Sequence, residues 1–244
     1  MKRFKADLHI HSCLSPCGDL DMSPRAIVDK GLERGMEIIA LCDHNSAENV
    51  GAAMRAGRLK GLCVLPGMEI TSKEEVHVLA IFDTQEQALR MQEIIYRHLR
   101  GTNRPELFGD QVVANEFDEV ERFNDRLLIG AAQIDLHQVV KDVHRLGGLS
   151  IASHVDRPSF SILSQLGFIP GDVSFDALEI SRNATRDRVV REMPGVEGFT
   201  LVSFSDAHFL HEVGEPFSSF LMETPEVEEI RMALRSEGGR RVVN

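Results

Sequence analysis

The sequence predicts an α/β fold in which parallel strands alternate with helices, and three observations support this expectation. Short apolar segments alternate with amphipathic ones along the chain, as in successive strand–helix units. The length of 244 residues, with 43% hydrophobic residues, suits one domain of the size of an α/β barrel. Histidines and carboxylates follow the ends of the apolar segments, where barrels of parallel strands assemble their active sites.

Residues 1–100 contain apolar segments that predict strands over 4–10, 37–42, 62–70 and 76–82, the last two joined by a hairpin-like step. After the first strand, Ser23 and Pro24 are typical of a helix start and Gly35 of a helix end. Amphipathic periodicity predicts two more helices, over about 46–59 and 84–100.

Residues 101–128 are polar and irregular, and no element is predicted there. Further on, Asp135 is the predicted N-cap of a helix that ends at Gly147. The remaining strands are expected over 149–154, 177–181 and 199–208. The last helix is expected over 224–236, with Thr224 as N-cap and Pro225 in its first turn.

The composition argues against several classes of protein. The net charge of −11, from 27 basic and 38 acidic residues, disfavours a protein that binds long nucleic-acid duplexes. The longest apolar runs are too short to cross a membrane and the first residues show no signal peptide, so we expect a cytoplasmic protein. The cysteines lack disulfide spacing, and free thiols are expected at Cys13, Cys17, Cys42 and Cys63.

Nine residues near the expected strand ends carry side chains that bind metals. Two of them, His9 and His11, flank Ile10 in an expected strand, so their side chains point to one face. Imidazoles and carboxylates suit Zn, Mn or Fe, and nine ligands suffice for two or three ions. The candidates are His9, His11, Asp19, His44, Glu69, His77, His154, Asp206 and His208. The other histidines, His98, His137, His144 and His211, are expected to be solvated or packed.

Six short motifs occur in a characteristic order: "DLHIH" (7–11), "LCDHN" (41–45), "PGMEI" (66–70), "VHVL" (76–79), "ASHVDRP" (152–158) and "FSDAH" (204–208). On these motifs the chain resembles the PHP (polymerase and histidinol phosphatase) superfamily of metal-dependent phosphoesterases, and in particular its stand-alone bacterial members. The resemblance implies one PHP domain over residues 1–244. It also implies a distorted (β/α)7 TIM-like barrel with a trinuclear metal centre at the C-terminal ends of the strands.

The resemblance also implies how the ligands are shared among the ions. The first ion would be held by His9, His11, Glu69 and Asp206. Glu69 would bridge to a second ion that also takes His77 and His154. The third would be held by His44, His208 and an acidic residue of the first loop. Asp19 is preferred there over Cys17 because its offset from Pro24 matches that in relatives.

Such a centre would hydrolyse a phosphate mono- or diester through a metal-bridging hydroxide, with Glu69, Asp206 and His208 as the catalytic residues. Asp43 is expected to orient a neighbouring ligand histidine by accepting its other N–H. Arg157 and Arg182 are candidates to bind the substrate phosphate, or else to form salt bridges at the rim. The expected substrate is a small phosphorylated molecule, a class that includes nucleotides and short oligonucleotides.

Two other functions are open alternatives. The chain could be a metal-bound PHP module that serves as a scaffold or regulatory partner without catalysis. It could also hydrolyse a bond other than a phosphate ester, since amidohydrolases too begin with His-x-His on a strand. That family typically adds a lysine at a strand end, whereas Lys60, Lys73 and Lys141 fall in expected turns and a helix.

Overall fold

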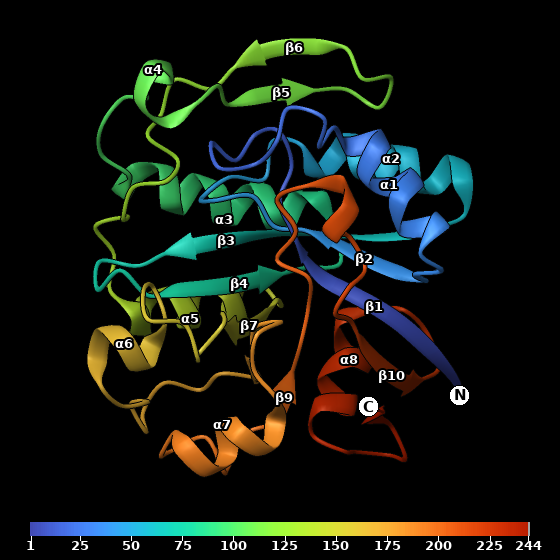
Figure 1. Ribbon diagram of the computed structural model, residues 1–244, viewed down its shortest axis with the longest axis vertical. Helices are drawn as coiled ribbons and strands as arrows, with labels where there is room; N and C mark the ends of the chain where they lie inside the picture. The colour runs from blue at the N-terminus through green and yellow to red at the C-terminus, as the bar shows by residue number, and fades with distance from the viewer. Residues whose placement is uncertain (244) are drawn as a thin grey trace.

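The computed structural model describes residues 1–243, which form a nine-stranded sheet, a small hairpin and a set of helices (Figure 1). Along the sheet the order is β11-β10-β1-β2-β3-β4-β7-β8-β9. The strands are β1 (Lys2–Ile10), β2 (Ile38–Leu41), β3 (Cys63–Thr71), β4 (His77–Ile81), β7 (Leu149–Ala152), β8 (Ala177–Glu179), β9 (Leu201–Val202), β10 (Ser218–Met222) and β11 (Arg241–Val243).

The sheet curves into a nearly closed barrel, as predicted. The strands β1 to β3 run parallel, as do β7 to β9, whereas β4 is antiparallel to both of its neighbours. The segment after β9 returns to β1, where the His11 N–H donates to the Ala207 carbonyl at 3.0 Å. The barrel is therefore a distorted α/β barrel of the TIM type, with β10 paired outside it on β1 and β11 paired on β10.

The antiparallel β4 places His77 among the candidate ligands. In a parallel barrel a residue at the start of a strand would lie at the face opposite the active site. Because β4 runs the other way, its first residue meets the carboxyl ends of β3 and β7. The predicted hairpin between 62–70 and 76–82 is what reverses the direction.

The helices are α1 (Pro24–Glu33), α2 (Val50–Lys60), α3 (Gln85–His98), α4 (Pro105–Phe108), α5 (Leu136–Arg145), α6 (Ile162–Leu166), α7 (Arg186–Glu192) and α8 (Val227–Leu234), with a 3₁₀ turn, η1 (Leu210–Glu212). The predicted N-caps Ser23 and Asp135 are confirmed, since each side chain accepts a hydrogen bond from a first-turn N–H. None of the helices within residues 1–243 is both long and apolar enough to cross a membrane.

Three expectations about elements are wrong. The second helix begins at Val50 rather than near 46. The last helix begins at Val227, because the Val227 N–H donates to the Asp83 carboxylate at 2.8 Å and Thr224 precedes the helix. Residues 101–128 also contain regular elements: α4 and a hairpin of β5 (Val112–Ala114) and β6 (Val120–Phe123).

The β5–β6 hairpin supports the loop that follows β1 (Figure 1). The Val112 N–H donates to the Cys13 carbonyl at 2.9 Å, and Leu14 packs in a buried cluster with Val113 and Leu128. The Asn49 carboxamide, just before α2, bonds both Val112 and Ala114. This segment therefore fixes the loop that leads from His11 to α1.

The sheet is buried on both faces, as its short apolar strands predict. In β2, Ile39 and Leu41 pack in the cluster that includes residues of α1 and α2. Ile38 and Ala40, which alternate with them, pack in a second cluster with residues of β1, β7 and α8. The polar residues of the candidate site follow directly where these strands end.

Candidate metal centre

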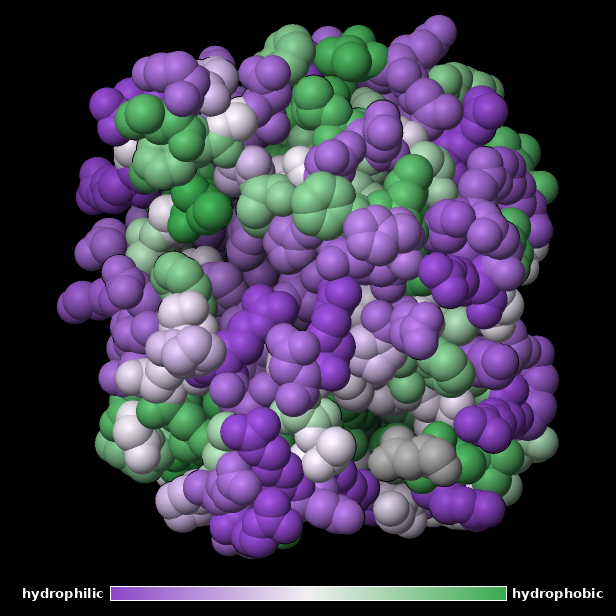
Figure 2. Space-filling view, in the orientation of Figure 1, coloured by the Kyte–Doolittle hydropathy of each residue, from purple (hydrophilic) through white to green (hydrophobic). Residues whose placement is uncertain are grey.

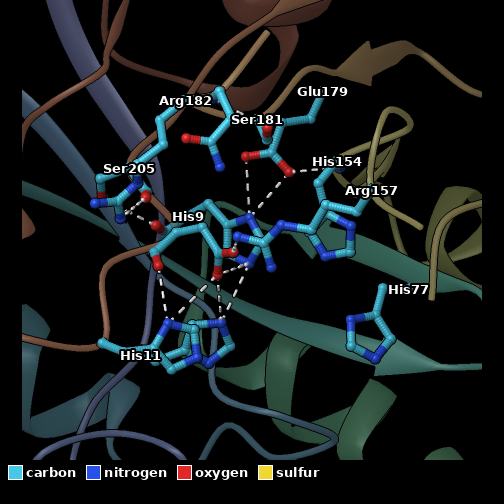
Figure 3. A network of polar contacts seen from close by, with 12 residues as sticks. His9, His11, His77, His154, Arg157, Glu179, Ser181, Arg182 and Ser205 are labelled. Carbon is cyan, nitrogen blue, oxygen red and sulfur yellow. Dashed lines mark hydrogen bonds and ion pairs between the residues drawn. The ribbon is translucent and has the colours of Figure 1, made fainter. Parts of the chain in front are cut away.

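Eight of the nine predicted ligands converge at one end of the barrel. They come from β1, β3 and β4 and from the segments after β2, β7 and β9. Three groups have their ligand atoms within 4.8 Å of one another: His9–His11–Asp206, His11–His44–His208 and His44–Glu69–His77. His154 joins them, since its Nε2 lies 3.2 Å from Glu69 Oε1. Figure 3 shows four of the histidines, His9, His11, His77 and His154, gathered at this end of the barrel.

Glu69 lies between the groups and is almost fully buried. Its Oε1 lies 3.0 Å from His77 Nδ1 and 3.4 Å from His9 Nε2, and its Oε2 lies 3.2 Å from His44 Nδ1. Burial raises the pKa of this carboxyl, but the charges of His77 and His9 outweigh it and hold the pKa well below its usual range. Glu69 is therefore an ionised carboxylate shared by histidines on both of its oxygens.

Asp206 contacts the first histidine pair. Its Oδ1 lies 3.3 Å from His9 Nε2 and 3.2 Å from His11 Nε2, while its Oδ2 forms an ion pair with Arg157. Asp206 has a φ of 48° and His154 a φ of 30°, conformations that are strained for residues other than glycine. Backbone strain of this kind, at the two turns that present ligands, is typical of functional sites.

Hydrogen bonds fix which nitrogen of three histidines faces the centre. His9 Nδ1 lies 3.0 Å from both Glu179 oxygens and donates to them, so the neutral form of this ring would carry no proton on Nε2. His11 Nδ1 donates to Ser15 Oγ, whose own proton goes to Asp43. His208 Nδ1 donates to the Asp206 carbonyl at 2.8 Å. In its neutral form each ring therefore has an Nε2 lone pair free to bind a cation.

Glu179, at the end of β8, is a supporting residue that the sequence analysis missed. Besides His9, it accepts a hydrogen bond from the His154 N–H at 3.1 Å. Although burial opposes it, the charges of Glu179, Asp206 and Glu69 raise the pKa of His9 well above its usual value. The position of Glu179 could have indicated this role, because it is an acidic residue near the carboxyl end of the predicted strand 177–181, and the other candidates lie at such strand ends.

Asp43 does not contact a ligand histidine directly, contrary to the prediction. Its carboxylate accepts bonds from the Ser12 N–H, the Ser12 hydroxyl and the Ser15 hydroxyl, each at 2.7 Å. Burial raises its pKa, and these bonds oppose that rise. Asp43 therefore acts on His11 through Ser15, whose hydroxyl lies between them.

The arrangement of the buried nitrogens fits bound cations. His9 Nε2 and His11 Nε2 lie 3.2 Å apart, so two lone pairs face each other when both Nδ1 protons are engaged elsewhere. His44 Nδ1 and His77 Nδ1 are buried and close to Glu69, yet neither makes a hydrogen bond. Buried polar atoms without partners are costly, and a cation between such nitrogens and carboxylates would satisfy them. The clusters suggest divalent metal binding.

Asp19 is the predicted ligand that the structure does not bring into these groups. Its carboxylate accepts a hydrogen bond from the Asp21 N–H at 2.9 Å, within the turn that leads to α1. The chain reaches this turn through a tight bend in which the Gly18 N–H donates to the Ser15 carbonyl. Cys17, in that bend, lines the opening of the centre together with Asp206 and His208.

The centre opens to the surface through a hollow of about 400 Å³ that Arg157 and Arg182 line. Hydrophilic side chains gather over the middle of this face, where Figure 2 shows the surface hollowed. Both arginines are about one-third exposed, and both form salt bridges: Arg157 with Asp206, and Arg182 with Glu212 at 3.0 Å. The rim salt bridges anticipated for them are present, and their guanidinium groups also face the opening.

Another hollow, of about 760 Å³, lies away from these histidines. Its lining includes Asp176 together with His144 and Arg231, each of which pairs with Asp176. Of the other histidines, His137 pairs with the exposed Asp172. None of His98, His137, His144 and His211 belongs to a cluster of metal-binding geometry within residues 1–243.

Comparisons with known proteins agree with this geometry. The family model of the PHP domain matches residues 7–163. A 5′-3′ exoribonuclease of Haemophilus influenzae is 31% identical over 80 residues, which are 32% of this chain and 28% of the exoribonuclease.

Two solved structures are similar over nearly the whole chain. Endonuclease Q of Pyrococcus furiosus, described as a lesion-specific endonuclease, superposes with a TM-score of 0.71 at 20% identity. The match covers 99% of this chain and 58% of the endonuclease, so this chain spans little more than half of that protein. A protein of Bifidobacterium adolescentis assigned as a metal-dependent phosphoesterase has a TM-score of 0.62 at 19% identity, over 95% and 96% of the two chains.

Proposed function

The chain belongs to the PHP domain family, and on this premise we propose that it is a hydrolase of phosphate esters that uses two or three divalent metal ions. The family and the named neighbours support a metal-dependent phosphoesterase or nuclease. The observation that carries the proposal is Glu69, a buried ionised carboxylate with histidine nitrogens at both oxygens. Carboxylates so placed hold two ions a few ångströms apart, as two-metal phosphoesterases require.

We assign the ions to the following residues. His9, His11, Glu69 and Asp206 would hold the first, and Glu69, His77 and His154 the second. His44 and His208 would hold a third, completed by the loop of Cys17 and Asp19. Nitrogen and oxygen donors of this kind suit Zn, Mn or Fe.

The chain's own residues would each do part of the chemistry. Ions bound there would lower the pKa of coordinated water and neutralise charge on the phosphoryl oxygens. Glu69 and Asp206 keep their charge at neutral pH, because neighbouring histidines lower the pKa of both. Arg157 and Arg182 at the opening would bind the phosphate oxygens through paired N–H groups. If only the first two ions are bound, a protonated His208, with 22% of its side chain exposed, would be free to donate a proton to a leaving oxygen.

We further propose that residues 1–244 form one domain and that the substrate is a small phosphorylated molecule, a nucleotide or a short oligonucleotide. Endonuclease Q has been solved with a 27-mer duplex carrying an abasic lesion, which supports a phosphodiester in a nucleic acid as substrate. The net charge of −11 works against binding of a long duplex by this chain.

The test is metal analysis together with release of p-nitrophenol from p-nitrophenyl phosphate and bis-p-nitrophenyl phosphate. We expect two to three equivalents of metal and metal-dependent turnover, which Glu69→Gln abolishes. Glu197→Gln, on the exposed surface, is the matched control and should keep both the metal content and the turnover of the wild type.

Less than one equivalent after supplementation, without turnover, would refute the proposal. Full metal occupancy without turnover of either ester would instead favour the alternative function, a non-catalytic scaffold.

A further inference from the structure

A second, smaller pocket adjoins the opening of the metal centre and shares Arg157 with it. It encloses about 170 Å³ between the segment after β7, the segment after β8 and α7. Pro158, Ala184, Val189 and Met193 supply an apolar wall. Because Arg157 lines both hollows, a ligand that extends from the pocket to the centre passes this guanidinium.

The pocket is held in shape by the chain itself. Both carboxylate oxygens of Asp156 accept bonds from Ser181, one from its N–H and one from its hydroxyl, each at 2.6 Å. These bonds tie the segment after β7 to the segment after β8. Ser181 lies beside Glu179 and Arg182 (Figure 3), so the same segments position the pocket and the residues around the metal centre.

Asn183 and Arg188 offer polar groups to a ligand in the pocket. The Asn183 N–H donates to Ser181 Oγ, but its carboxamide makes no hydrogen bond to the described part of the chain. A carboxamide donates and accepts at once, which matches the edge of a nucleobase. Arg188 bonds Glu192 through Nε, and a guanidinium plane can stack on an aromatic ring. An apolar wall beside a carboxamide and a guanidinium suits a flat heterocycle.

We propose that this pocket binds the base of a nucleotide whose phosphate lies at the metal centre, with Arg157 between the two. The inference rests on the proposed phosphoesterase function and narrows its substrate to nucleotides. The pocket is too small for a whole nucleotide, since pockets for complete ligands measure roughly 300–1,000 Å³. The small volume and the Arg157 side chain shared with the opening therefore favour a ligand whose ring lies in the pocket and whose phosphate lies outside it.

The first measurement compares kcat/KM for adenosine and uridine 5′-monophosphates with kcat/KM for glycerol 3-phosphate, which has no ring. Ala184→Phe fills the pocket with an aromatic side chain. We expect it to lower the ratio of nucleotide to glycerol phosphate turnover by about tenfold or more, with glycerol phosphate hydrolysis unchanged. Asn183→Ala, at an exposed position, should lower the ratio in the same direction without a risk to folding.

Val190→Phe is the matched control, because it adds the same ring to α7 at an exposed position outside the pocket. It should leave the ratio as in the wild type. Thermal melting would verify that all variants are folded. The proposal would be overturned if the ratio of nucleotide to glycerol phosphate turnover were equal in wild type, Ala184→Phe and Asn183→Ala.

A binding measurement separates failure of this inference from failure of the proposed function. Adenosine and uridine carry no phosphate. Calorimetric or NMR titration with them therefore measures binding to the pocket independently of the metal ions and of catalysis. If no ester is hydrolysed, binding that is lost in Ala184→Phe and kept in Val190→Phe still supports the pocket. If esters are hydrolysed but neither nucleoside binds, the base pocket is refuted and the phosphoesterase stands.

Discussion

At the scale of single residues, the centre depends on which nitrogen of each histidine carries the proton. Glu179, Ser15 and the Asp206 carbonyl each accept the Nδ1 proton of one ring. These partners lie behind the rings and touch no substrate. Supporting residues of this kind set the orientation and basicity of the ligands. Their loss therefore lowers the affinity for the metal without removing a ligand.

The variant Glu179→Gln tests this support. The amide keeps the shape of the carboxylate but removes its charge and one of the two oxygens that His9 Nδ1 faces. We expect metal retention against a chelator to fall roughly 10–100-fold, while the folded structure persists. Retention equal to that of the wild type would show that Glu179 does not position His9, and Glu192→Gln on the exposed surface serves as control.

Arg157 is the residue whose two interpretations are easiest to separate. If it binds phosphate, Arg157→Ala should lower kcat/KM for p-nitrophenyl phosphate at least about tenfold, mostly through KM, with metal content unchanged. If it mainly holds Asp206 through their ion pair, metal content should fall as well. Arg186→Ala, at an exposed position, controls for the loss of one positive charge.

At the scale of elements, helix starts show how local signals succeed and fail. Ser23, Thr84 and Asp135 each accept a bond from their own first turn. For α8 the first amide is bonded by Asp83, which lies far away in the sequence. A side chain from another element has replaced the local cap, so Thr224 has no capping role.

This contrast gives a paired stability prediction. Asp135→Ala should lower the free energy of unfolding by about 1 kcal/mol, because the Gln138 N–H loses its acceptor at 2.8 Å. Thr224→Ala should change it by no more than experimental error. Urea unfolding of both variants measures the difference, and equal losses would contradict the helix start at Val227.

At the scale of the whole molecule, Asp176 joins elements that are distant in the sequence. Its Oδ2 accepts bonds from His144 in α5 and from the Ser150 N–H in β7, each at 2.9 Å. Its Oδ1 pairs with Arg231 in α8 at 3.3 Å. Burial raises the pKa of this carboxyl, but the bonds and charges of these partners outweigh it, and the pKa lies below its usual value.

A lowered pKa in the folded state means that the carboxylate stabilises the fold above its usual pKa and loses this effect as the pH falls. Asp176→Asn should therefore cost about 3 kcal/mol of unfolding free energy at pH 7, since it leaves the partly buried Arg231 with only the mostly exposed Glu228 as an acidic partner. The gap to the wild type should narrow below about pH 4, where the wild-type carboxyl also becomes protonated.

The matched control is Asp172→Asn. Asp172 pairs with His137 at 2.9 Å, but both side chains are mostly exposed. Exposed pairs contribute little to stability, so this variant should remain within about 1 kcal/mol of the wild type. A loss at Asp176 that is equally small, or that stays constant with pH, would rule out the network as a source of stability.

Much of the fold and of the centre was predictable from the sequence. The ligands at strand ends were recognisable because several His and acidic residues directly follow apolar runs, and this repeated pattern is typical of a metal site at the carboxyl ends of strands. Spacing from Pro24 could not reveal that Asp19 lies outside the three groups of ligands, because its place depends on the bend at Gly18 and on the bond from the Asp21 N–H. Glu179 was missed because its role depends on His9, 170 residues away in the chain.

The sequence by itself determined the α/β class, the helix caps at Ser23 and Asp135 and the identity of most candidate ligands. These properties depend on the periodicity of apolar residues and on contacts between residues a few positions apart. The order of residues along the chain specifies both directly. Only the tertiary structure decided that β4 runs antiparallel, that Asp43 reaches His11 through Ser15, and that Arg157 lies between two hollows. Each of these depends on distances between segments that meet only when the barrel closes.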